Sequence, residues 1–183
     1  MGIKTRSFLK NENRNFNNIL DSMVNKNNGT EYRYGNTAGA DIADSGTGLA
    51  LDSTAFGRTF LCLLDGASKT VTLPPNVTHE DMGKQFLIVQ KVDLVASGVL
   101  TIATGAGNTF SLNSIVKPVA SVDQFRPNAD ASNTLTITGA ATNSGWGAGS
   151  SIFCQVVAAG EWYVEVDCRA LGDGSDAIAF TTA

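Results

Sequence analysis

The fold class of this chain is decided by the stretch Ser151-Ile-Phe-Cys-Gln-Val-Val-Ala-Ala-Gly-Glu-Trp-Tyr-Val-Glu-Val-Asp-Cys168. Apolar and polar side chains largely alternate on both sides of the turn Ala159-Gly160-Glu161, and a period of two is typical of half-buried β-strands. We therefore predict that residues 156–158 and 162–166 pair as a β-hairpin. Since successive side chains of a strand point to opposite faces, Trp162 and Tyr163 are expected on opposite sides, one of them in the core.

Other short runs of β-branched and apolar residues, bounded by turn signals such as Asp-Gly and Ser-Gly, precede this hairpin. They cover residues 59–64, 69–73, 85–92, 99–104, 114–119 and 134–138. One helical turn is expected over 78–82, with Thr78 as its cap, Asp81 in its first turn and Gly83 at its end. Regularly spaced short strands with almost no helix between them predict an all-β fold, either an antiparallel β-sandwich or a jelly-roll-like barrel.

One pattern occurs twice in this region. Leu100-Thr-Ile-Ala-Thr-Gly-Ala-Gly-Asn108 is similar to Leu135-Thr-Ile-Thr-Gly-Ala-Ala-Thr-Asn143. Two copies are too few for a solenoid, and they indicate equivalent hairpins in a two-sheet β structure.

The N-terminal segment has a different character. Phe16, Ile19, Leu20 and Met23 are spaced so that a helix would place all four on one stripe, with Asn15 as its N-cap. A helix of about ten residues is marginal alone in water, so this stripe must pack on its own domain or on a neighbour. The predicted organisation is an N-terminal helical arm (1–28), an extended loop or linker (29–58) and a β-sandwich body (59–183).

Composition and charge narrow the function. The 183 residues include 43% hydrophobic and only 16% charged residues, against roughly 25% charged in an average domain. No apolar run approaches the ~20 residues that span a bilayer, so no membrane partner is expected. Residues 1–26 carry five basic and two acidic side chains, net +3, whereas the remainder carries eight and fifteen, net −7. An acidic body repels phosphate, so a nucleic-acid partner is not expected, and the basic arm suits an acidic patch on another protein.

Motifs for chemistry are weak. The lone histidine, His79, is expected on an exposed turn, because its acidic neighbours in sequence point away from it. Cys62, Cys154 and Cys168 form no C-x-x-C pair and are expected to be reduced, although a disulfide between the last two is possible across a hairpin. The run Gly172-Asp-Gly-Ser-Asp176 supplies too few carboxylates for a calcium loop. We predict no catalytic residue, no metal site and no cofactor.

The Gly-rich segment Gly145-Trp-Gly-Ala-Gly149 is predicted to be a loop that exposes Trp146. An exposed loop aromatic suits an interface contact, and it could also serve as a platform for a sugar.

Residues 59–166 resemble a pattern of structural proteins of tailed bacteriophages. The pieces are Thr70-Val-Thr-Leu-Pro74, Gly83, Phe86-Leu-Ile-Val89, Gly98-x-Leu-Thr-Ile102, Gly107-Asn-x-Phe110 and Gly160-Glu-Trp-Tyr-Val164. The series is similar to capsid decoration (cement) proteins and also to tail-fibre domains.

That resemblance implies a non-enzymatic virion protein. It implies a homo-oligomer, commonly a trimer, on the outer surface of the capsid, assembled in the host cytoplasm and bound to the major capsid protein. The alternative is a tail-fibre or receptor-binding domain that recognises a host surface glycan. A third reading, a glycan hydrolase or lyase, finds no acid–base pair in the sequence.

Overall fold

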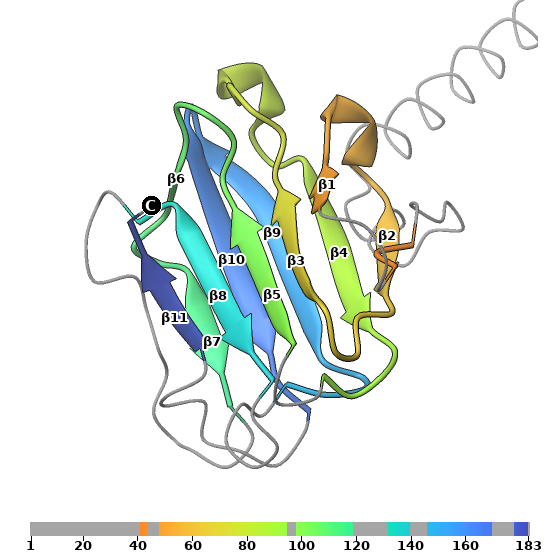
Figure 1. Ribbon diagram of the computed structural model, residues 1–183. Helices are drawn as coiled ribbons and strands as arrows, with labels where there is room; N and C mark the ends of the chain where they lie inside the picture. The colour runs from red at the N-terminus through yellow and green to blue at the C-terminus, as the bar shows by residue number, and fades with distance from the viewer. Residues whose placement is uncertain are drawn as a thin grey trace, which may run out of the picture.

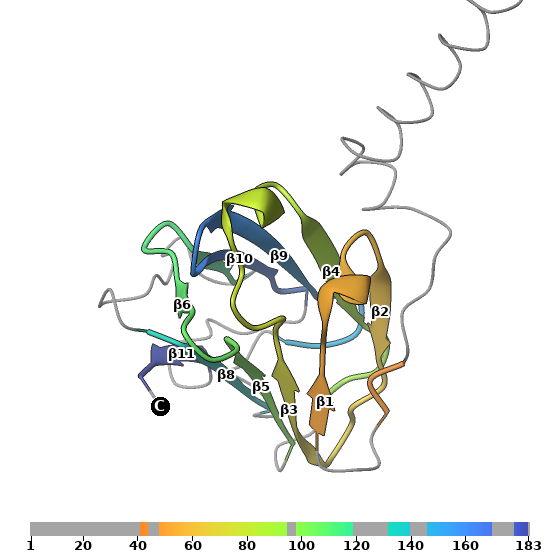
Figure 2. The ribbon, with the colours of Figure 1, turned by 90° about the horizontal axis from the view of Figure 1, so that it is seen from above.

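Two stacked β-sheets form the body of the protein (Figures 1 and 2). The computed structural model describes residues 41–43, 48–94, 98–118, 132–139, 146–169 and 178–182. The predicted helical arm and its stripe of Phe16, Ile19, Leu20 and Met23 lie outside the described residues.

One sheet has five strands. Their order is β1 (Gly48–Ala50), β3 (Ser68–Thr72), β5 (Val99–Ala103), β8 (Thr134–Thr138) and β11 (Ile178–Thr181). The other sheet has six strands. Their order is β2 (Thr59–Cys62), β4 (Gln85–Gln90), β9 (Ser151–Ala158), β10 (Glu161–Asp167) and β6 (Thr109–Phe110), and β7 (Ile115–Lys117) also pairs with β10. Neither sheet closes into a barrel.

Both sheets are mixed, so the prediction of a purely antiparallel sandwich is wrong in this respect. From β1 to β5 successive strands lie in alternate sheets. The chain therefore returns to the same sheet with every second strand. The strands β1, β3 and β5 are therefore parallel neighbours, as are β2 and β4. Antiparallel pairing begins further along, where β8 joins β5 and where β9 joins β4 and β10.

Strict alternation of side chains builds the core. In β4, β9 and β10, buried residues alternate with partly exposed ones along most of each strand. The centre is aromatic: the Trp162 ring stacks on Phe56 at 6.1 Å between centroids and meets the edge of Phe86 at 5.8 Å. Trp162 is fully buried and Tyr163 faces outward, which confirms the alternation predicted for this strand.

The predicted β-runs correspond to β2, β3, β4, β5, β7, β8, β9 and β10, with ends that differ by a few residues. The hairpin between β9 and β10 turns at Gly160, whose φ of 73° lies in the left-handed region that favours glycine. The repeated pattern produces β5 and β8, which pair directly, with Leu100 opposite Ile137 and Ile102 opposite Leu135.

Part of the segment 29–58 belongs to the body. Within it β1 pairs with β3, and the short 3-10 helix η1 (Ser53–Ala55) is capped by Asp52. Leu51 and Ala55 are buried in the core. The extended-loop prediction overlooked these contacts because a three-residue strand has no periodicity to detect.

Replacing Trp162 by Ala should lower the free energy of unfolding by about 3–5 kcal/mol, because it removes a fully buried ring and leaves a cavity. Tyr163→Ala is the matched control on the opposite face of the same strand and should cost about 1 kcal/mol or less. Denaturant unfolding of both variants measures the difference, and equal losses would contradict the assignment of the two faces.

Candidate interaction surfaces

Three of the motif pieces that carry the phage resemblance, within 70–74, 107–110 and 160–164, meet at one end of the sandwich. Asn108 is buried, and its side-chain amide donates to the carbonyl of Pro74 at 3.1 Å. The Gly160 N–H donates to Val77 O, and Gly160 O accepts from the Thr109 N–H, both at 2.9 Å. Three motif pieces that are far apart in sequence are thus joined by hydrogen bonds, so they explain how the chain crosses between sheets and supply no reactive group.

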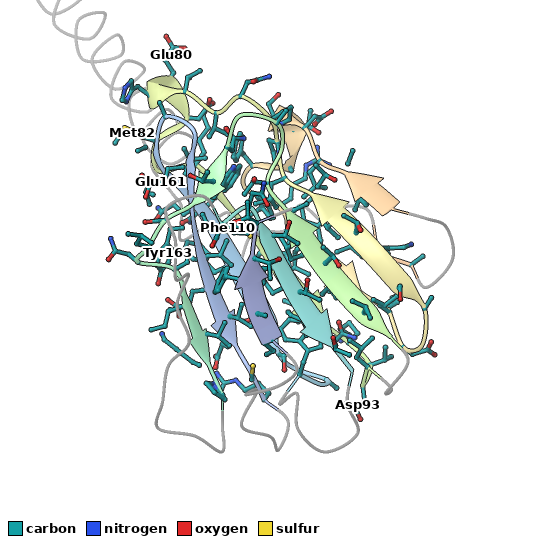
Figure 3. The ribbon with its side chains drawn as sticks, turned by 60° about the vertical axis from the view of Figure 1, so that its left-hand side comes forward. Glu80, Met82, Asp93, Phe110, Glu161 and Tyr163 are labelled. Atoms are coloured by element: carbon teal, nitrogen blue, oxygen red, sulfur yellow. The ribbon has the colours of Figure 1, made fainter. Side chains whose placement is uncertain are left out.

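At the same end lies the predicted helical turn, which is the 3-10 helix η2 (His79–Asp81). Thr78 caps it, and Asp81 accepts from the Thr78 N–H, which completes a capping box. His79 is exposed, as predicted, and so is Met82, with 53% of its surface accessible. Figure 3 shows Glu80 and Met82 at this end of the molecule, and Asp93 at the other.

The Asp81 carboxylate gives this turn its pH dependence. Its bond to the Lys84 ammonium (2.7 Å) and then its bond with the Thr78 N–H hold its pKa below the ordinary value for aspartate. A carboxyl group whose pKa is lowered by folding stabilises the protein above its unfolded pKa, and this contribution is lost as the pH falls through the lowered value.

Asp81→Ala should therefore reduce the free energy of unfolding by about 0.5–1 kcal/mol at neutral pH, through the lost capping bonds. The deficit should shrink at acid pH, as the pH falls through the lowered pKa of Asp81 and the native carboxyl group loses the charge that strengthens these bonds. Denaturant melts of both proteins at the two pH values test this, and a deficit that is unchanged in acid would contradict it.

The outer face of the six-stranded sheet carries an apolar patch. We call Leu61 of β2, Leu87 and Val89 of β4 and Phe153 of β9 the outer apolar patch; each alternates with buried neighbours and so points away from the core. Leu61 lies opposite Val89, and Leu87 lies opposite Phe153. The Phe153 ring also meets Tyr163 of β10 edge-on, 6.4 Å between centroids.

Charge borders the patch on β10. Glu165 pairs with Lys117 at 2.8 Å and accepts from the Tyr163 hydroxyl at 2.9 Å. Asp167 pairs with Arg169 at 2.6 Å. These pairs are partly exposed, so each contributes little to stability, but together they give the patch a hydrophilic edge.

The outer face of the five-stranded sheet is different, because it is covered by threonines. Thr70 of β3, Thr101 of β5 and Thr136 of β8 lie side by side in register across the sheet. Their methyl groups pack on one another and their hydroxyl groups can bond water, so this face needs no further cover.

Trp146 does not lie on either surface. It is only 2% exposed and belongs to the core, so the prediction that it is exposed is wrong. The turn that follows it is fixed by distant segments: the Ala148 N–H donates to Asp93 at 2.8 Å, and the Gly149 N–H donates to Gln90 O at 2.8 Å. These bonds draw the Gly-rich segment onto the body and bury the indole ring.

The three cysteines are buried and form no disulfide with one another. Burial raises the pKa of the Cys154 thiol above its ordinary range, and burial together with the Asp167 charge raises that of Cys168 to about 12. In the described part of the chain no three His, Cys, Asp or Glu side chains gather as a metal site would require. The segment 172–176 lies outside the described residues.

We expect no thiol of the folded protein to react with a disulfide reagent at about pH 8, because the thiolate is the reactive form. All three should react once guanidinium unfolds the chain, and an absorbance assay with and without denaturant counts them. A thiol that reacts at once in the native protein would contradict the burial.

Comparison with known proteins gives no match: no protein-family model fits the chain, and neither a curated protein nor a solved structure is similar to it. Over the described residues, no helix is long and apolar enough to cross a membrane. The case for a function therefore rests on the sequence and on the surfaces described above.

Proposed function

We propose that the protein is a virion structural protein that decorates the outer head shell of a tailed bacteriophage and stabilises it as a trimer. Its partners are the major capsid protein and other copies of itself. It binds the outer surface of the capsid. The particle assembles in the host cytoplasm. The arm side chains Phe16, Ile19, Leu20 and Met23 contact the shell or a neighbouring copy.

The observation that carries this proposal is the contrast between the two outer faces. A sheet face covered by threonines is complete in water, whereas four large apolar side chains gathered on one outer face are typical of a surface that another element covers. A protein that binds through such surfaces needs no reacting group, and repetition around a symmetric shell makes modest contacts firm.

The charge distribution supports the same proposal. The arm carries net +3, whereas the rest of the chain carries net −7. A positively charged arm is attracted to an acidic surface on a partner. The basic residues of such an arm attract it to the partner, and its apolar stripe is buried in the contact. Burial contributes roughly 1.5–3 kcal/mol for each large side chain that leaves water.

A receptor-binding domain is the second candidate. The observation that favours it is the outward pair of Phe153 and Tyr163, since adjacent exposed aromatic rings can stack on a sugar. Trp146, which the sequence suggested for this role, is buried. A glycan array with the native protein and Tyr163→Ala separates the two: a decoration protein gives no signal that depends on Tyr163.

The main test removes residues 1–26 and measures how many copies remain on shells assembled from the capsid protein of the same phage. We expect occupancy to fall at least about tenfold, because the stripe and the basic residues are lost together. The shortened protein should keep the circular dichroism spectrum of a β fold, which shows that the body is folded. Unchanged occupancy would refute the role of the arm.

A further inference from the structure

The chain enters the described body at the edge of the six-stranded sheet. Ile42 is buried and lies parallel to β2: its N–H donates to Leu61 O at 2.8 Å, and its carbonyl accepts from the Leu63 N–H at 2.9 Å. Since β2 is the first strand of this sheet, the 40 residues that precede Asp41 join the body beside Leu61, which is itself part of the outer apolar patch.

Strand β4, beneath the centre of the patch, has the composition of a strand covered on both faces. Its run Phe86-Leu87-Ile88-Val89 is apolar without interruption. Continuous apolar runs are typical of strands with packing on either side, whereas a face open to water gives alternation with polar residues. The five-stranded sheet shows that second pattern, with Thr134, Thr136 and Thr138 outward on β8.

The arm has the matching stripe and the necessary reach. Seventeen residues separate Met23 from Asp41, enough for up to ~60 Å of extended chain. The patch begins beside the point of entry and ends two strands away, ~10 Å across the sheet. A tether of this length presents the stripe to its own sheet at about millimolar effective concentration, which a second copy in dilute solution does not match.

We propose that residues 16–23 dock as an amphipathic helix on the outer apolar patch of the same chain, with Phe16, Ile19, Leu20 and Met23 against Leu61, Leu87, Val89 and Phe153. The patch gives the short helix the surface that it needs to form, and the helix covers the only outer face on which the described strands gather large apolar side chains. This inference goes beyond the proposed function and does not depend on it.

Crosslinking in the free, full-length protein tests the docking. A photoreactive phenylalanine analogue at position 87 should crosslink to peptides that contain residues 16–23, as read by mass spectrometry. The matched control places the same analogue at position 101, on the outer face of the five-stranded sheet, and should give no such peptide. The sample mixes heavy-isotope and light chains, so that crosslinks within a chain and between chains have different masses.

Crosslinks within one chain from position 87 and not from position 101 support the proposal. Mixed-mass crosslinks would show that a second copy occupies the patch, and the absence of arm peptides, or equal amounts from both positions, would show that the arm does not dock there. Each of these results overturns the inference. Because no shell is present, none of them measures shell occupancy, so a failure of the docking is distinguished from a failure of the proposed function.

A second measurement leaves the body unchanged. Phe16→Asp with Leu20→Asp places two charges in the stripe, whereas Asn18→Asp with Asn25→Asp places the same two charges on the opposite side of the predicted helix. Docking should protect Arg14 from trypsin, so the stripe variant should be cut there at least about tenfold faster than the native chain, and the control variant at the native rate. Equal rates in all three proteins would overturn the inference.

Discussion

Every described strand of at least four residues buries alternate side chains between two sheets, and the rest of the molecule follows from that constraint. Neither sheet is stable alone in water, because most residues of its inner face are apolar, from Phe60 of β2 to Val164 of β10 and from Val71 of β3 to Phe180 of β11. The chain crosses between the two sheets from β1 to β5, so each sheet covers the inner face of the other. The crossings require tight turns, and the hydrogen bonds of Asn108 and Gly160 hold them at one end.

The inner faces of the two sheets cover each other, so the surface properties of this protein depend on its outer faces. The two outer faces differ in the side chains that they present to water. Threonine rows bond water directly, whereas Leu87 and Phe153 offer it nothing. The physical effect that joins the two sheets therefore also favours cover on the outside of the six-stranded sheet. A function based on binding follows more directly from this asymmetry than one based on a reacting group.

The strands could be predicted from sequence because alternation is a local property, and the capping box of Thr78 and Asp81 is local as well. Strand partners could not be predicted, since the parallel pairing of β3 with β5 depends on crossings that no short window contains. The exposure of Trp146 was misjudged for the same reason: glycines around it suggest a loop, but bonds to Asp93 and Gln90 decide where that loop lies. The outer apolar patch could not be predicted either, because it joins residues of three strands whose order no short window contains.

The two proposals together make attachment an exchange. If the four arm side chains already pack on their own sheet, they must leave that sheet before they bind the shell. The free energy of binding is then only the difference between the two sets of contacts. Such a protein would bind a single capsid subunit weakly, because one acceptor site barely exceeds the internal one. It would bind an assembled lattice firmly, because several arms of one oligomer exchange together and their small differences add. A patch that competes with the shell for the arm thus makes attachment depend on the assembled lattice.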